Sequence, residues 1–243
     1  MVLTGAGIST DSGIADYRGP NGLWTKNPKA ERTSNISYYL NDPEVRRLAW
    51  EHRLGSPIWD AQPNAGHHAL VELERQGRLD TLVTQNVDGL HHLAGHDPAR
   101  IIEIHGNART VVCWDCNESA PMERALERVR AGEADPPCRS CGGILKSATI
   151  SFGQQLVVDD LQRAEAAAQR ADLLLAIGST LGVYPAAGLV PTALQAGAAL
   201  VIINADPTPY DAHADVVLYA GISEVLPEIV RDGRPRPAGG APA

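Results

Sequence analysis

The four cysteines of this chain form two Cys-x-x-Cys pairs, Cys113 with Cys116 and Cys138 with Cys141. Each pair can direct two thiolates at one ion, and two such pairs complete the tetrahedral sulfur set of a structural zinc site. A redox dithiol needs only one pair, and two disulfides need an oxidising compartment. The spacing therefore predicts one structural zinc ion per chain, with no open position for catalysis.

Composition narrows the classes of protein to consider. The chain has 243 residues, a net charge of -8 and 44% hydrophobic residues, which suits one large domain or one domain with a small module. The acidic balance argues against a broad nucleic-acid-binding face, so we expect no specific nucleic-acid partner. No apolar run approaches the length of a membrane span, and the first residues lack the features of a signal peptide. We therefore expect a cytoplasmic protein without a membrane partner.

Short aliphatic runs alternate with helical patterns along most of the chain. Such runs are typical of parallel strands that are buried on both faces. Helices are predicted from Asn64 to Gly77, from Asp159 to Ala171 and from Pro185 to near Gly197. Strands are predicted at 1–4, 79–84, 100–104, 172–177, 199–203 and 215–219. The alternation predicts an α/β fold, a doubly wound Rossmann-like parallel sheet.

Two segments interrupt the alternation. The first contains one predicted helix, from Pro43 to Arg53, and its length is typical of a helical and loop insertion over a binding site. The second contains all four cysteines. The expected organisation is a Rossmann-like domain at 1–107 and 147–230, an insertion over the pocket at 20–62, a zinc-ribbon module at 108–146 and a disordered tail at 231–243.

A glycine turn, Gly5-Ala6-Gly7, follows the first predicted strand. Glycines between a strand and a helix let the backbone approach a pyrophosphate. The third glycine of the dinucleotide fingerprint is replaced by Thr10, and no acidic residue follows at the usual spacing. A turn without a ligand is therefore an open alternative at this point.

Polar residues follow several of the predicted strands. The carboxyl ends of strands in an open α/β sheet line the ligand crevice. One such residue is more often a cap or turn former, but four sets together predict a shared site. The four sets are Thr84-Gln85-Asn86-Val87-Asp88, Ile104-His105-Gly106, Gly178-Ser179-Thr180 and Asn204-Ala205-Asp206.

In combination these motifs resemble the sirtuin family of NAD-dependent protein deacylases, and their order extends from residue 3 to about residue 230. The resemblance implies a protein lysine deacetylase that transfers the acyl group to ADP-ribose and releases nicotinamide. The alternatives within the family are a deacylase that prefers longer or acidic acyl groups and a mono-ADP-ribosyltransferase. The matching segments are 5–9, 12–18, 84–88, 105–106, the four cysteines, 178–181, 183–186 and Asn204.

The resemblance also implies roles for single residues. His105 would be the general base, for which imidazole is suited because its pKa lies near working pH. Asn86 would be catalytic and, with Asp88, would line the nicotinamide pocket. The residues expected to contact NAD are Gly5, Ala6, Gly7, Ser9, Asp16, Tyr17, Arg18, Gln85, Asn86, Val87, Asp88, Gly178, Ser179, Thr180, Asn204, Asp206 and Ala220.

The chain departs from the family pattern near the expected substrate. Sirtuins bind the acylated peptide by strand addition, here near Ile150–Gly153, where Ser151 and Gln154 replace an aromatic and an acid. Sirtuins that remove acidic acyl groups carry Tyr-x-x-Arg, whereas this chain has Trp50-Glu51-His52-Arg53. We expect a packed Trp50 and a solvated Arg53, and hence deacetylation as the main activity. The segment from Asp16 to Trp24 resembles a subgroup with weaker deacetylases, long-chain deacylases and ADP-ribosyltransferases.

Three further interpretations concern the histidines and the class of protein. His67, His68, His91 and His92 are expected on helices, as packing or solvated residues and not as metal ligands. An NAD-dependent oxidoreductase would keep NAD intact, and the absent third glycine argues against it. A non-catalytic NAD sensor or scaffold is disfavoured because His105, Asn86 and Asp88 are all present.

Overall fold

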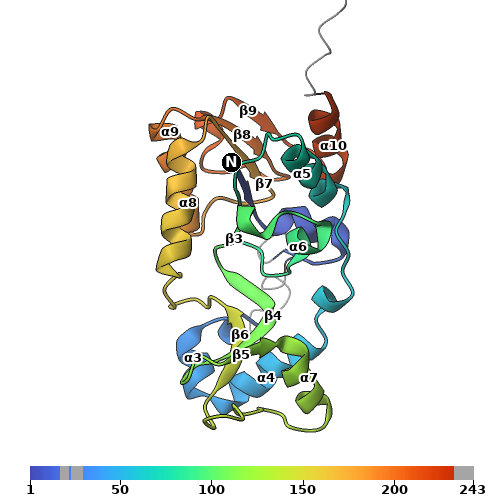
Figure 1. Ribbon diagram of the computed structural model, residues 1–243, viewed down its shortest axis with the longest axis vertical. Coiled ribbons are helices and arrows are strands. Elements are labelled where there is room, and N and C mark those ends of the chain that lie inside the picture. Colours follow the sequence, from blue (N-terminus) through green and yellow to red (C-terminus); the bar gives the residue numbers. More distant parts are fainter. Residues whose placement is uncertain (17–21, 23–29, 233–243) are drawn as a thin grey trace, which may run out of the picture.

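The structure is a computed structural model that describes residues 1–16, 22 and 30–232. Its larger sheet contains six parallel strands in the order β3-β2-β1-β7-β8-β9 (Figure 1). The strands are β1 (Val2–Thr4), β2 (Leu82–Thr84), β3 (Ile101–Glu103), β7 (Leu173–Ile177), β8 (Ala199–Ile203) and β9 (Val216–Leu218). The chain order reverses between β1 and β7, and such a switch point opens a crevice at the carboxyl ends of the strands. The predicted doubly wound α/β fold is confirmed.

A smaller antiparallel sheet lies at the other end of the molecule (Figure 1). Its strands, in the order β5-β4-β6, are β4 (Gly106–Cys113), β5 (Ser119–Pro121) and β6 (Leu145–Thr149). The α-helices are α2 (Ala30–Thr33), α3 (Ile36–Asn41), α4 (Pro43–Leu54), α5 (Ala65–Arg75), α6 (Leu90–Ala94), α7 (Met122–Arg130), α8 (Val158–Arg170), α9 (Leu189–Gln195) and α10 (Ile222–Asp232). Short 3₁₀ helices are η1 (Ala6–Ser12), η2 (Pro57–Trp59), η3 (Pro98–Arg100), η4 (Ala186–Gly188) and η5 (Asp211–His213).

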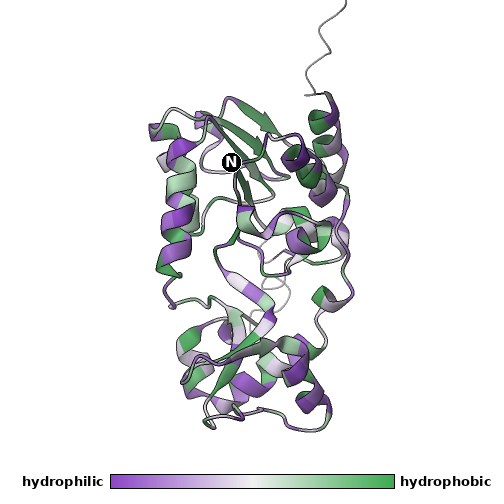
Figure 2. Ribbon diagram, in the orientation of Figure 1, coloured by the Kyte–Doolittle hydropathy of each residue, from purple (hydrophilic) through white to green (hydrophobic). Residues whose placement is uncertain are grey.

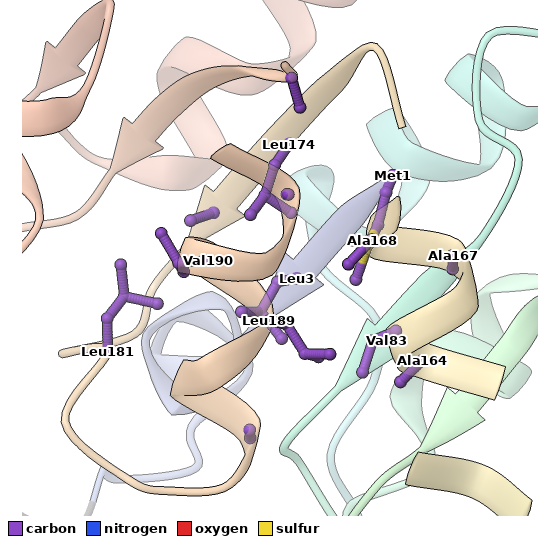
Figure 3. Packing of buried hydrophobic residues seen from close by; sticks show 14 of the residues in the cluster. Met1, Leu3, Val83, Ala164, Ala167, Ala168, Leu174, Leu181, Leu189 and Val190 are labelled. Atoms are coloured by element: carbon purple, nitrogen blue, oxygen red, sulfur yellow. The ribbon is translucent and has the colours of Figure 1, made fainter. Parts of the chain in front are cut away.

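Helices cover both faces of the large sheet, which explains why its strands are almost wholly aliphatic. Helices α8 and α9 pack on one face, where alanines such as Ala164 and Ala168 let the helix approach Leu3 and Val83 closely (Figure 3). Helices α5 and α10 cover the other face through residues such as Leu70 and Leu226. In Figure 2 the strands of this sheet are mostly green, whereas the helices alternate between purple and green.

The small sheet shares a third core with the helices of the insertion. Trp50 of α4 is fully buried among Val111, Leu126 and Leu145, together with two of the cysteines. Helices α3, α4 and α7 therefore lie with the small sheet at one end of the molecule, away from the large sheet (Figure 1).

The predicted elements are present, with three differences. The glycine turn leads into the 3₁₀ helix η1, and Pro185 precedes η4 before α9 begins at Leu189. The insertion contains α2 and α3 besides the predicted α4. Helix α10 extends through Asp232 because Leu226 and Val230 pack into the core, so the start of segment 231–243 is helical. The rest of that segment lies outside the described residues. No helix in the described ranges is long and apolar enough to cross a bilayer.

Candidate active site

A cavity of about 1120 Å³ opens where the strands of the large sheet end, and it extends to the small sheet. Most residues predicted to bind NAD line it. They are Gly5, Ala6, Gly7, Asp16, Gln85, Asn86, Val87, Gly178, Ser179, Thr180, Asn204, Asp206 and Ala220, and His105 lines it too. Ser9 and Asp88 lie behind the wall of the cavity, while Tyr17 and Arg18 fall outside the described residues.

The glycine turn is held tightly against the loop that follows β7. The Gly7 N–H donates to the Gly178 carbonyl at 2.8 Å. A Cβ on Gly5 would lie 2.6 Å from the Gly178 carbonyl oxygen, and one on Gly7 would lie 2.7 Å from the Gly178 Cα. The glycines are therefore required first for the close approach of two turns, and this approach builds the floor on which a pyrophosphate can lie.

A buried polar cluster fixes Asn86, which extends from the end of β2. The Asn86 amide donates to the Gly5 carbonyl at 3.1 Å and to the Ser9 hydroxyl at 3.2 Å. Ser9 donates in turn to the Asp88 carboxylate at 2.8 Å, and the Leu90 N–H donates to the other carboxylate oxygen at 2.8 Å. Burial raises the pKa of Asp88, and the hydrogen bonds from Leu90 and Ser9 oppose this increase in part. Asp88 thus orients Asn86 through Ser9, and its direct contact with nicotinamide stays a prediction.

His105 follows β3 and has one ring nitrogen in a fixed hydrogen bond. Its Nδ1 lies 3.0 Å from the backbone carbonyl of Gln85, and because a carbonyl can only accept, Nδ1 carries the proton. Nε2 then keeps its lone pair, as a general base requires. Burial lowers the pKa of His105, and the Gln85 carbonyl opposes this in part.

The side chains that follow β2 and β7 bond to each other across the end of β1, which lies between these two strands. Gln85 Nε2 donates to the Ser179 hydroxyl at 2.8 Å, and Ser179 also accepts from the Leu181 N–H at 3.2 Å. Asn204, at the end of β8, donates to the Asp206 carbonyl at 2.7 Å. These bonds leave a row of neutral polar groups along the wall, which suits the hydroxyls of a nucleoside.

The segment after β6 has one occupied edge. The Ile150 N–H donates to the His105 carbonyl at 2.7 Å, and Phe152 exchanges backbone bonds with Ser34 and Ile36 at 2.8 and 3.0 Å. The chain turns after Phe152, where Gly153 has a φ of 82° and the Gln154 N–H donates to the Ser151 carbonyl at 2.9 Å. The Gln154 side chain also accepts from the Ser151 N–H at 3.3 Å, so both backbone groups of Ser151 bond to Gln154.

Trp50 and Arg53 differ in where they face. Trp50 is buried in the core of the small sheet, as predicted. Arg53 lines the cavity and is partly buried, so the expectation of a solvated arginine is wrong. The reason is aromatic contact with the guanidinium, whose Cζ lies 4.9 Å from the Trp50 ring centroid and 5.2 Å from that of Tyr39.

The four cysteine sulfurs lie together, all within 4.8 Å of one another. Cys113 Sγ is 3.5 Å from Cys141 Sγ, and Cys116 Sγ is 3.8 Å from Cys138 Sγ. Four sulfurs each about 2.3 Å from one ion would be about 3.8 Å apart, so the arrangement fits tetrahedral zinc. With four thiolates and no open position, the ion would hold the loops of the small sheet together.

Several residues near the site were not predicted from the sequence. Ser147 and Thr149 of β6 line the cavity, and Tyr39 and Lys146 lie behind it. Residues two positions apart in a strand point to the same face, so the spacing of Ser147 and Thr149 could have indicated that both face the cavity. Tyr39 meets the site only through the packing of α3, which no local pattern reveals.

Known proteins are similar to this chain in sequence and in fold. The Sir2 family pattern matches residues 5–185. "NAD-dependent protein deacetylase 2" of Streptomyces coelicolor is 49% identical over 230 residues, which cover 95% of each chain. "NAD-dependent protein deacetylase" of Sulfolobus acidocaldarius is 42% identical and covers 95% of this chain and 88% of its own.

Two solved structures extend the comparison. "Structural Basis for the Mechanism and Regulation of Sir2 Enzymes" matches with a TM-score of 0.85 and 39% identity, covering 95% of this chain and 90% of its own. "Sir2-p53 peptide-NAD+" matches with a TM-score of 0.85 and 33% identity, covering 96% and 92%. The chain therefore belongs to the Sir2 family, and the resemblance found in the sequence is confirmed.

Proposed function

We propose that the protein is an NAD-dependent protein lysine deacetylase, which transfers the acyl group from lysine to ADP-ribose and releases nicotinamide. The observation that carries the proposal is His105. Its Nδ1 is bonded to the Gln85 carbonyl, so Nε2 is available as a base in the cavity that also contains the glycine turn. Relatives named as NAD-dependent protein deacetylases and a solved Sir2 structure with peptide and NAD support the proposal.

The chain supplies binding, orientation and a proton acceptor. NAD, when bound, supplies the ribose that accepts the acyl group and the nicotinamide that leaves. The turn at Ala6 and Gly7 would hold the pyrophosphate, and Asn86 would orient the nicotinamide end. His105 Nε2 would take a proton from a ribose hydroxyl, because its neutral form is favoured by burial.

An acylated protein segment would bind as an added strand near Ile150–Gly153. The backbone bonds of Ile150 and Phe152 hold this segment beside His105 and the start of α3. Two bonds to Gln154, one from the Ser151 N–H and one to the Ser151 carbonyl, would be exchanged for bonds to the peptide. Main-chain bonding of this kind does not depend on the side chains that depart from the family pattern.

A second candidate activity is removal of acidic acyl groups, such as succinyl. The observation in its favour is Arg53, which lines the cavity and which no carboxylate among the described residues pairs with. A guanidinium binds a carboxylate through two charge-assisted hydrogen bonds.

The test is nicotinamide release from NAD with acetyl-, succinyl- and long-chain acyl-lysine peptides of one sequence. We expect release with acetyl peptide, and a loss of about a hundredfold or more in kcat for His105→Ala because the general base is removed. NAD binding should be retained.

His68→Ala is the matched control, since His68 is exposed on α5 and lies outside the cavity. Near-normal turnover of His105→Ala at saturating NAD would overturn the assignment of the base. NADH formation without nicotinamide release would favour an oxidoreductase, and no turnover of NAD with any peptide would favour a binding module.

A further inference from the structure

The pairing of β4 with β6 is interrupted beside the cavity. Asn107 lies opposite Ala148, and the next pair joins Val111 to Ser147, so residues 108–110 of β4 stand against a single step of β6. Extra residues of this kind form a β-bulge, at which the ladder of hydrogen bonds is broken and the strand bends. The backbone groups of both strands therefore need other partners at this point.

The bulge of β4 bonds to the loop that follows β2. The Ala108 N–H donates to the Val87 carbonyl at 2.8 Å, and Arg109 Nε donates to the Asp88 carbonyl at 2.8 Å. This loop also carries Asn86, on the side of the cavity where nicotinamide is expected. Strand β4 therefore supports the nicotinamide side here, and β6 depends on donors from elsewhere.

Lys146 supplies donors to β6 from within the same strand. Its Nζ donates to the Ser147 carbonyl at 2.8 Å and to the Thr149 carbonyl at 2.6 Å. Ser147 pairs with β4 on one side of the bulge and Thr149 on the other, so the ammonium bonds to both sides of the interruption. Equivalent atoms two residues apart in a regular strand are about 6.6 Å apart. One nitrogen reaches both oxygens here, so β6 is contracted between them.

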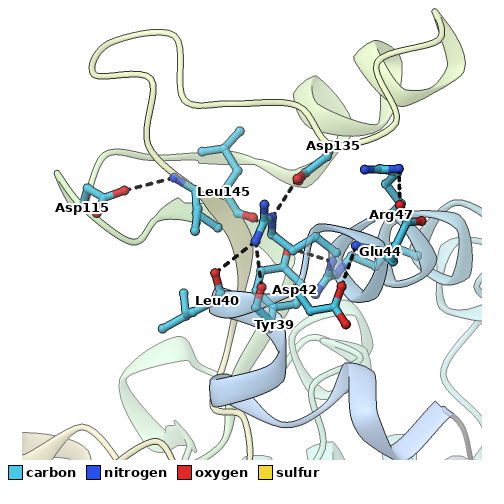
Figure 4. A network of polar contacts seen from close by, with 11 residues as sticks. Tyr39, Leu40, Asp42, Glu44, Arg47, Asp115, Asp135 and Leu145 are labelled. Carbon is cyan, nitrogen blue, oxygen red and sulfur yellow. Dashed lines mark hydrogen bonds and ion pairs between the residues drawn. The ribbon is translucent and has the colours of Figure 1, made fainter.

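Contacts at both ends fix β6 around this contraction. The Leu145 carbonyl accepts from the Tyr39 hydroxyl at 2.7 Å, in the network that joins α3 to β6 (Figure 4). Just beyond the other end, the Ile150 N–H donates to the His105 carbonyl at 2.7 Å. Lys146 therefore acts on a stretch between two fixed points, and its bonds determine how that stretch bends.

The same stretch forms one wall of the cavity. Ser147 and Thr149 line the cavity, and their hydroxyls share a hydrogen bond of 2.8 Å. The chain then continues into the segment expected to receive the acylated peptide. The glycine turn is held separately, because the Gly7 N–H bonds to the Gly178 carbonyl after β7. A change in the bend of β6 should therefore alter peptide binding more than NAD binding.

Lys146 is a buried cation, and no carboxylate in the described part of the chain pairs with it. It is 2% exposed, and burial, with a smaller effect from Arg53, lowers the pKa of Lys146 to about 8, so the amine is charged at pH 7. A buried charge without a counter-ion reduces stability, whereas an apolar side chain of similar length has no such cost. Methionine at this position removes the cost together with the two bonds, so this variant should fold.

We propose that Lys146 is a positioning residue, whose ammonium replaces the donors that β4 directs elsewhere at its bulge and thereby holds β6 in the bend that sets the peptide-binding segment beside His105. The inference rests on the deacetylase activity proposed above. Lys146 acts through the backbone of Ser147 and Thr149, and it has no contact of its own with NAD or the acyl group in this assignment.

The experiment compares Lys146→Met with Arg124→Met in the full chain, with nicotinamide release from NAD and one acetyl-lysine peptide as the assay. Arg124 is the matched control because it is an exposed cation on α7, which packs on the same small sheet. We expect Lys146→Met to raise KM for the peptide about tenfold, the effect of losing hydrogen bonds to a charged group, and to change KM for NAD less than twofold. Arg124→Met should change neither.

Lys146→Arg tests whether the donors are what matters, because a guanidinium also carries N–H groups for two carbonyls. Its peptide KM should lie closer to that of the unaltered protein than to that of Lys146→Met. Melting temperature and zinc content are measured for every variant, so that loss of the fold is distinguished from loss of position.

The outcomes separate the inference from the proposed function. An unchanged peptide KM in Lys146→Met would overturn the inference and leave deacetylation standing. If both Lys146 variants lose peptide and NAD binding together, with a lower melting temperature, Lys146 is structural only and the inference is overturned. If the unaltered protein releases no nicotinamide with any acyl-lysine peptide, the proposed function is overturned and the inference with it.

Discussion

The side chains proposed for catalysis and nicotinamide binding are oriented by backbone groups as much as by other side chains. His105 bonds to the Gln85 carbonyl, Asn86 bonds to the Gly5 carbonyl, and the Asp88 carboxylate accepts the Leu90 N–H. Backbone groups do not titrate and move little, so these bonds hold the side chains in place before a ligand binds. The same arrangement makes the proton on His105 Nδ1 a fixed feature of the site.

The pH dependence of turnover follows from the environment of His105. Because burial lowers the pKa of His105 below its usual 6.5, the imidazole is neutral at pH 7 and above. We expect kcat/KM for the acetyl peptide to be flat from pH 8 to about 6.5 and to fall at lower pH, where Nε2 takes a proton. Peptide turnover across this range, with NAD binding as the control, measures it. A midpoint above pH 7 would contradict the assignment.

At the scale of elements, the sequence predicted those helices and strands that are determined by interactions between residues close in the chain. Asn64 caps α5 and accepts from the Gly66 and His67 N–H groups, as its place before the helix indicated. The small sheet was not predicted, because β4 pairs with β6 across more than thirty residues and begins at Gly106 with a mixed pattern. Helix α7 was not predicted either, although its buried residues Met122, Ala125 and Leu126 have helical spacing. Tyr39 and Arg53 meet only through tertiary packing, which explains the error over Arg53.

The cysteine loops form the element most dependent on a ligand. Cys138→Ser should lower the zinc content below one ion per chain and lower the melting temperature, because metal binding and folding of such loops are coupled. Cys138 lies in the core that includes Trp50, so succinyl turnover should fall more than NAD binding. Metal analysis and thermal unfolding measure the change, with Arg139→Ala, an exposed neighbour, as the control. Active protein purified without zinc would contradict this prediction.

At the scale of the whole molecule, a buried histidine cluster lies behind the large sheet where α5, α6 and β1 meet. The rings of His67 and His91 are 4.9 Å apart, and those of His91 and His96 are 5.5 Å apart. His91 Nε2 lies 3.0 Å from the Thr4 hydroxyl, and His96 bonds to Glu74 at 2.6 Å. Each histidine has one ring nitrogen without a hydrogen-bond partner among the described residues. Burial favours the neutral form of these rings, and the Glu74 carboxylate opposes this in part at His96.

We therefore expect the free energy of unfolding to decrease in acid, because these histidines take up protons when the protein unfolds. Burial lowers the pKa of His67 to about 4, and burial also lowers the pKa values of His91 and His96. A group with a lowered folded pKa stabilises the fold above its unfolded value of about 6.5, and this contribution is lost as pH falls toward the folded value. His67 alone should cost about 2 kcal/mol between pH 7.5 and pH 5.

Urea unfolding at pH 7.5, 6 and 5 measures this loss across the whole fold. His67→Gln should flatten the fall in stability with pH, because glutamine at that position has no proton to take up on unfolding. His68→Gln is the matched control, since His68 is exposed on the same helix and should leave the slope unchanged. An equal slope in the unaltered protein and in His67→Gln would show that carboxylates elsewhere, and not the buried histidine cluster, set the acid limit of the fold.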